Sequence, residues 1–174
     1  MNLKILPKII CFGSTFLALG GLAANTFEIA KAQTDRSLCT EQVFNVSQEM
    51  QKRYGLNIQQ PTVSVLEDKT NPFPGSFIRY FSMITNYSDE RAWVKKATSN
   101  AEKFMNSTGI QLRLAKRVME ACPSTSKVSF GFARSGYWTH YFRMPSGQIR
   151  EGISLSCHRD RLNNNLPWGY YLSC

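Results

Sequence analysis

The sequence predicts an α+β fold in which two or three helices pack on one face of a four- or five-stranded antiparallel meander sheet. Apolar residues recur at helical spacing in two stretches of the first 122 residues. The last fifty residues instead alternate apolar and polar side chains between short turns, and this alternation leaves one apolar face for the helices to cover. Four cysteines downstream of the N-terminal segment add the expectation of two disulfides.

The N-terminus has the three parts of an export signal. Lys4 and Lys8 precede an uncharged apolar run over residues 9–24, and Ala30-Lys31-Ala32 is a small-x-small cleavage site. This run of 16 residues is shorter than the roughly 20 that cross a bilayer as a helix. We therefore expect residues 1–32 to be a cleaved signal peptide, with an uncleaved signal anchor as the alternative. Residues 33–174 would then form a single exported domain, periplasmic or extracellular, with no stable membrane span.

Two stretches have helical periodicity. The first begins at Asp35, a suitable N-cap, and Gly55 stops it. The second follows Ser88, again a suitable N-cap, and runs to Pro123 as one helix with a weak point at Gly109 or as two helices stacked nearly end to end. Its expected buried face consists of Trp93, Ala97, Ala101, Phe104, Thr108, Ala115, Val118, Met119 and Cys122.

The remaining segments predict strands and turns. Val63 and Val65 alternate with polar residues behind Pro61, as in a short edge strand. The segment Phe77 to Ile84 is apolar but ambiguous between strand and helix. Short turns after that point separate four expected strands of the meander, over residues 128–133, 137–143, 149–157 and 168–174.

The four cysteines of the expected mature chain indicate two structural disulfides. In a strict meander Cys122 and Cys174 lie at one end of the sheet, which favours Cys122–Cys174 with Cys39–Cys157. Proximity in the sequence favours Cys39–Cys122 with Cys157–Cys174 instead. The sequence leaves both pairings open.

Catalytic signals are sparse. The chain has no nucleophile elbow, zinc-protease motif or phosphate-binding glycine loop, and its two histidines do not have metal-ligand spacing, so we expect no metal and no cofactor. His140 lies on the same side of its strand as Trp138 and Phe142, which favours a packed, hydrogen-bonded histidine, while His158 lies in a polar segment. A small secreted hydrolase with His140 or His158 as general acid or base is therefore the alternative interpretation.

Binding is the favoured function class, and the candidate residues lie near one strand. If the helices cover the side of Trp138, then Tyr137 and Tyr141 are exposed on the other side. Arg143 is in line with them and Tyr171 lies on a nearby strand, so these four residues form the candidate binding site. The alternative is that a second layer, from residues 56–84, covers the tyrosines.

The chain is basic, with a net charge of +9. Residues 1–32 hold three of the 21 basic and one of the 12 acidic residues, so the expected mature domain carries about +7. We expect a partner such as an envelope protein, a peptide or an anionic polymer, and no nucleic acid. A solvated face is the expected arrangement for the basic residues of the second helical stretch, Lys95, Lys96, Lys103, Arg113, Lys116 and Arg117.

Overall fold

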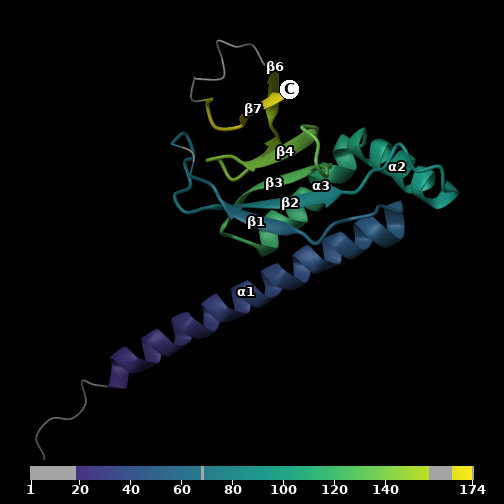
Figure 1. The fold of residues 1–174 in the computed structure, drawn as a ribbon. Coiled ribbons are helices and arrows are strands. Elements are labelled where there is room, and N and C mark those ends of the chain that lie inside the picture. Colours follow the sequence, from purple (N-terminus) through teal and green to yellow (C-terminus); the bar gives the residue numbers. More distant parts are fainter. Residues whose placement is uncertain (1–18, 68, 157–165, 174) are drawn as a thin grey trace, which may run out of the picture. The chain divides into compact units, whose positions relative to one another are not determined.

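A computed structural model describes residues 19–67, 69–156 and 166–173 of the chain. The chain divides into two compact units, residues 1–34 and residues 35–174, and the second holds the sheet and the core. In chain order the elements are α1 (Leu19–Tyr54), β1 (Thr62–Val65), β2 (Phe77–Met83), α2 (Ala92–Met105), α3 (Thr108–Ala121), β3 (Thr125–Phe132), β4 (Trp138–Arg143), β5 (Ile149–Glu151), β6 (Ile153–Ser156) and β7 (Tyr170–Ser173) (Figure 1).

Helix α1 begins upstream of the position that the sequence predicted. It starts at Leu19, so Asp35 lies inside the helix and the expected N-cap at Asp35 is wrong. The predicted end is confirmed, because α1 stops at Tyr54 and Gly55 adopts a positive φ of 64° that favours glycine. No helix within the described ranges is both long and apolar enough to cross a membrane. Cleavage after Ala32 stays a prediction.

The second helical stretch is two helices rather than one. The break lies between Met105 and Thr108, ahead of the weak point expected at Gly109. The buried amide of Gln111 donates to the carbonyl oxygens of Phe104 and Met105, both at 2.9 Å, and so satisfies carbonyls at the end of α2.

The N-terminus of α2 also differs from the prediction. Arg91, and not Ser88, occupies the N-cap position. The helix therefore buries Val94 in place of Trp93, whose side chain is 60% exposed. The expected placement of Trp93 on the buried face is wrong.

The five-stranded sheet is mixed. Its strand order is β1-β2-β3-β4-β5, and β2 pairs with β3 in parallel while the other pairs are antiparallel. Helices α2 and α3 form the connection that returns the chain to the starting end of the sheet, as a parallel pair requires. The ambiguous segment from Phe77 is therefore strand β2, and the expected meander is confirmed only for β3, β4 and β5.

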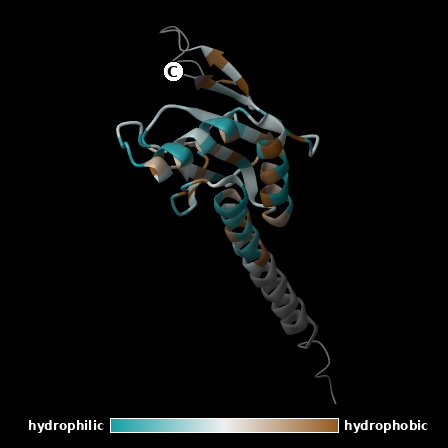
Figure 2. Cartoon of the chain, turned by 90° about the vertical axis from the view of Figure 1, so that its right-hand side faces the viewer, coloured by the Kyte–Doolittle hydropathy of each residue, from teal (hydrophilic) through white to brown (hydrophobic). Residues whose placement is uncertain are grey.

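The last predicted meander strand lies outside this sheet. Gly152 interrupts residues 149–157, and β6 pairs in parallel with β7 in a separate two-stranded ribbon whose strands both carry hydrophobic residues (Figure 2). A Cβ at Gly152 would lie 2.5 Å from Cε2 of Phe142 and 3.0 Å from Cδ1 of Tyr171. Only glycine allows the backbone to turn this close to both rings.

The two faces of the main sheet carry different side chains. In the register of β3 with β4, Val128 is opposite Tyr141 and Ser129 is opposite His140. Val128 and Tyr141 belong to the hydrophobic core with Phe130 and with residues of the helices, so they face the helices. His140 faces the other way and contacts Tyr171 of the ribbon.

A disulfide joins α1 to the residue that follows α3. The sulfur atoms of Cys39 and Cys122 are bonded, and their Cα atoms are 4.7 Å apart. Because a cysteine forms only one disulfide, this bond excludes the pairing Cys122–Cys174 with Cys39–Cys157. A strict meander favoured that pairing, but the main sheet does not contain β7. Cys157 and Cys174 lie outside the described residues.

Removal of the Cys39–Cys122 bond should destabilise the fold substantially. The bond closes a loop of 83 residues, and loop-closure entropy of that size corresponds to about 4 kcal/mol. Urea denaturation of Cys39→Ala, Cys122→Ala and the double variant measures the loss. Because each single change already breaks the bond, all three variants should lose similar free energies of unfolding; a wild-type value in all three would contradict the pairing.

Candidate functional site

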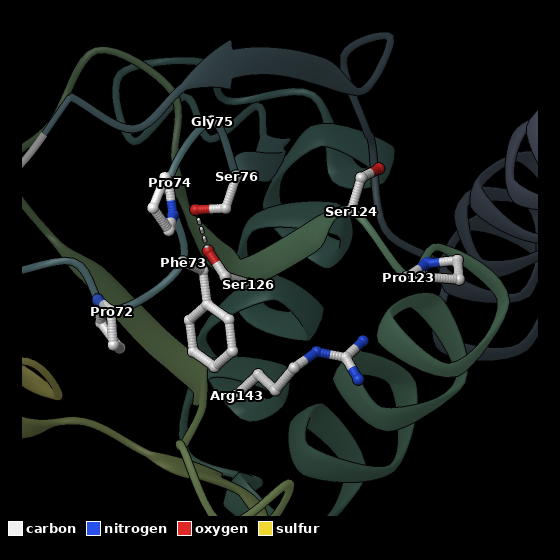
Figure 3. Close-up of a pocket in the computed structure, with 9 residues that line it drawn as sticks. All are labelled: Pro72, Phe73, Pro74, Gly75, Ser76, Pro123, Ser124, Ser126 and Arg143. Atoms are coloured by element: carbon white, nitrogen blue, oxygen red, sulfur yellow. Dashed lines mark hydrogen bonds between the residues drawn. The ribbon is translucent and has the colours of Figure 1, made fainter.

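A hollow of about 310 Å³ opens where the parallel strands β2 and β3 begin. It lies between the loop that precedes β2 and the segment that joins α3 to β3, with one side chain from the end of β4 (Figure 3). Its lining residues are Pro72, Phe73, Pro74, Gly75, Ser76, Pro123, Ser124, Ser126 and Arg143.

The loop on one side of the hollow is held by Asn71. The Nδ2 atom of Asn71 donates to the carbonyl oxygen of Phe73 at 2.8 Å and to Oγ of Ser76 at 2.7 Å, while its Oδ1 accepts from the Phe73 amide at 2.9 Å. An asparagine that bonds its neighbours in this way fixes a turn. The two prolines of the loop, Pro72 and Pro74, further restrict its backbone.

Serine hydroxyls line the base of the hollow. Ser126 Oγ donates to Ser76 Oγ at 2.7 Å, and both residues are buried. The carbonyl of Ser124 accepts the amide of Phe77 at 2.9 Å, which ties the start of β2 to the segment before β3. The hydroxyl groups are thus set in a hydrogen-bonded framework rather than on a free loop.

Arg143 supplies a cation at the wall of the hollow. Its Nε donates to the carbonyl oxygen of Thr125 at 3.4 Å, and its Nη2 donates to that of Met119 in the last turn of α3. A positive charge at the carbonyl end of a helix interacts favourably with the helix dipole. Within the described residues, no carboxylate forms an ion pair with this half-buried guanidinium.

The hollow combines rigid apolar walls, hydroxyl groups and one cation. Proline and phenylalanine rings bury apolar groups, while a guanidinium can bond a carboxylate through two parallel N–H groups. These residues offer no general base, and no cluster of three or more metal-ligating side chains exists in the part of the chain that the structure describes. The chemistry available here is recognition of a small anionic group with an apolar neighbour.

Of the four predicted binding residues, Arg143 alone lines this hollow. Tyr137 is half exposed and stacks on Phe132, with ring centroids 5.4 Å apart. It precedes the first residue of β4 whereas Arg143 is the last, so the two lie about 20 Å apart along the strand. Tyr171 packs edge-on against His140 at 4.5 Å, and burial together with the charge of Glu151 raises its pKa.

Tyr141 is a core residue, and its expected exposure is wrong. Its side chain is fully buried, and its hydroxyl donates to the carbonyl oxygen of Thr108 at 3.2 Å. Burial raises the pKa of this phenol, and the charge of Glu151 raises it further. Both faces of β4 carry aromatic residues, so the strand's own pattern does not select its buried face. Pairing with Val128 and Phe130 of β3 selects it.

His140 is a packed histidine. Its Nδ1 lies 2.8 Å from Oγ of Ser129, which is itself fully buried, and its ring contacts Phe142 and Tyr171 edge-on. Burial, assisted by the charge of Lys127, lowers its pKa to about 3. The ring is therefore neutral at physiological pH. His158, the other candidate for acid–base catalysis, lies outside the described residues.

The sequence contained part of the signal for the hollow. The run from Asn71 to Gly75 is recognisable as a loop because of its prolines and glycine. Nothing in residues 123–126 indicates that they meet this loop. Their contact follows from the parallel pairing of β2 with β3, which the sequence did not predict.

The stability of the protein should fall as the pH drops below 6.5 because of His140. The folded-state pKa, about 3, lies below the value of about 6.5 of an unfolded histidine, so the unfolded state binds more protons between these values. The contribution approaches 1.4 kcal/mol per pH unit.

Urea denaturation of the wild type and of His140→Asn between pH 7 and 4.5 isolates this effect. Both proteins have the same carboxylates, so the part of the pH dependence that comes from carboxylates is common to the two. The free energy of unfolding of the variant should depend less steeply on pH. Parallel curves for the two proteins would show that His140 does not titrate abnormally.

No protein-family model matches the chain, and no curated protein or solved structure shows significant similarity to it. The residues and their geometry are therefore the basis for inferring its function.

Proposed function

We propose that this protein is an exported, non-catalytic binding domain that holds a carboxylate-bearing peptide segment in the hollow at Arg143. The observation that carries the proposal is that Arg143, a half-buried cation with no carboxylate partner among the described residues, lines the same hollow as Phe73 and the two prolines. A peptide carboxylate would supply the missing charge, and its adjoining side chain would pack on the proline and phenylalanine walls.

The rigidity of the hollow supports a binding role. Asn71 fixes one wall by three hydrogen bonds, and the disulfide at Cys122 holds the other wall directly before Pro123. A site that is ordered before the ligand arrives loses less conformational entropy on binding. The volume of about 310 Å³ lies at the small end of the range for small-ligand sites, so a few residues of a peptide fill it.

The alternative, a hydrolase with His140 as general base, has less support. A base with a pKa of about 3 is a weak proton acceptor at neutral pH. Its hydroxyl neighbour, Ser129, is fully buried and out of reach of a substrate.

Export of the protein is part of the proposal. The Cys39–Cys122 disulfide is compatible with an oxidising compartment, where such bonds persist. The two remaining cysteines of the expected mature chain, Cys157 and Cys174, each directly follow a residue of the last β6–β7 pair, Ser156 and Ser173. We therefore expect Cys157 and Cys174 to form the second disulfide.

Non-reducing peptide mapping by mass spectrometry tests export and pairing together. Protein purified from its native source should begin at Gln33 and yield two crosslinked peptide pairs, Cys39 with Cys122 and Cys157 with Cys174. Free thiols on a chain that retains residues 1–32 would contradict the proposed export.

Binding at the hollow is tested with short peptides that carry a free C-terminal carboxylate, compared with the same peptides in amidated form. In two-dimensional amide NMR the free acids should shift the signals of Ser76, Ser124 and Ser126, and the amides should not. The Arg143→Gln variant should bind at least about tenfold more weakly, because its charge-assisted bonds are lost.

Two further variants separate binding from folding. Arg143 also bonds the end of α3, so Phe73→Ala serves as a second site variant that leaves those bonds in place. Arg150→Gln, in the neighbouring strand β5, removes the same charge outside the hollow and should bind normally. Signal shifts confined to other parts of the sheet, or equal binding of acids and amides, would refute the carboxylate site.

A further inference from the structure

The structure gathers basic side chains around a single carboxylate on the outer side of α1 and α3. Glu49 forms ion pairs with Arg53 at 3.6 Å, with Arg113 at 3.4 Å and with Arg117. Arg113 also donates to the Tyr54 hydroxyl at 2.6 Å. The pKa of Glu49 reflects this: burial raises it, but the Arg117 hydrogen bond and the charges of the three arginines outweigh burial and lower it.

One carboxylate does not balance three guanidinium groups. One ion pair is enough to link α1 to α3. Arg117, whose side chain is the most buried of the three cations, forms that pair with Glu49. The side chains of Arg113 and Arg53 are 48% and 65% exposed, so they face solvent while Glu49 fixes their position. Two unit charges therefore remain uncompensated within the cluster.

Arg113 and Arg117 of this group line a hollow of about 340 Å³ on the exposed side of α3. The lining residues follow helical spacing along one stripe: Gly109, Leu112, Arg113, Lys116, Arg117 and Glu120. Lys116 forms no ion pair with any carboxylate of the described residues. Gly109 leaves the N-terminal end of the stripe open, because nothing lies within 4 Å of a Cβ built there.

We propose that the Glu49 cluster, defined as Glu49, Arg53, Arg113, Lys116 and Arg117, binds linear polyphosphate. Charge complementarity selects an anionic partner. An open stripe along a helix fits an extended chain, whereas a compact anion would require an enclosed site. This surface shares no lining residue with the hollow at Arg143, so the inference is independent of the proposed function.

Phosphate fits the arrangement of the donors. Arg113 and Lys116 stand three residues apart on one helix face, so both can reach a single anionic group. Arginine bonds phosphate through two parallel N–H groups and lysine bonds it as a point charge, so Arg113 and Lys116 offer both kinds of contact to one phosphate.

The test measures binding of the full chain to fluorescently labelled inorganic polyphosphate by anisotropy over a range of salt concentrations. The Arg113→Gln, Lys116→Gln double variant should bind about tenfold more weakly at low salt. The slope of log Kd against log salt should lessen by about 1.5, since two phosphate contacts are lost.

A matched control removes two charges elsewhere. Lys96→Gln with Lys103→Gln does so on exposed positions of α2 and should alter Kd by less than about twofold, because these lysines lie outside the cluster. Equal losses in the two double variants would overturn the proposal in favour of non-specific attraction to a basic protein.

Two further results bear on the assignment. Glu49→Gln, in a protein whose thermal unfolding confirms that it folds, should bind polyphosphate more tightly, because the arginines lose their internal anion; an unchanged or weaker affinity would refute the cluster as the binding surface. Polyglutamate of matched charge should bind less tightly than polyphosphate. Equal affinity for the two polymers would overturn the assignment to phosphate.

Discussion

The parallel pairing of β2 with β3 is the constraint on which the other features of the fold depend. Because both strands run in one direction, the chain has to cross the sheet between Met83 and Thr125, and α2 with α3 makes that crossing. The strands consequently begin at the same end, where Phe77 lies opposite Thr125. The loops before the two strands meet there, and their contact forms the hollow lined by Arg143.

Several interactions that stabilise this junction lie at the end of α3. The carbonyl oxygen of Met119 in its last turn accepts a hydrogen bond from Arg143, and Cys122, which follows the helix, forms the disulfide with Cys39 of α1. A second half-buried arginine, Arg79, bonds Cys39 Sγ and Thr125 Oγ1, both at 3.4 Å, and burial lowers its pKa. Two cations thus lie near the carbonyl end of one helix, where its dipole offsets part of their desolvation.

Local signals in the sequence were sufficient for part of the fold. The glycine after α1, the short edge strand behind Pro61 and the β3–β4 hairpin each depend on neighbouring residues and were predictable. The parallel pair, the break at Gly152 and the buried face of β4 depend on contacts between distant segments. Both candidate sites are of this second kind, since Arg143 meets a loop 70 residues earlier and Arg113 meets Glu49 across 64 residues. The periodicity of apolar residues along the chain carries no information about contacts between residues so far apart in the sequence.

The two edges of the main sheet are short: β1 has four residues and β5 has three. Val63 and Val65 of β1 are about half exposed, a composition that in a long edge strand would offer a template for another chain. Pro61 precedes the four residues and lacks an amide hydrogen, and Leu66 directs its own amide to the carbonyl of Ser76. Because β1 has only four residues, few outward-facing backbone groups lie along this edge. The sheet limits edge-to-edge aggregation by the brevity of its outer strands, without charged residues in β1.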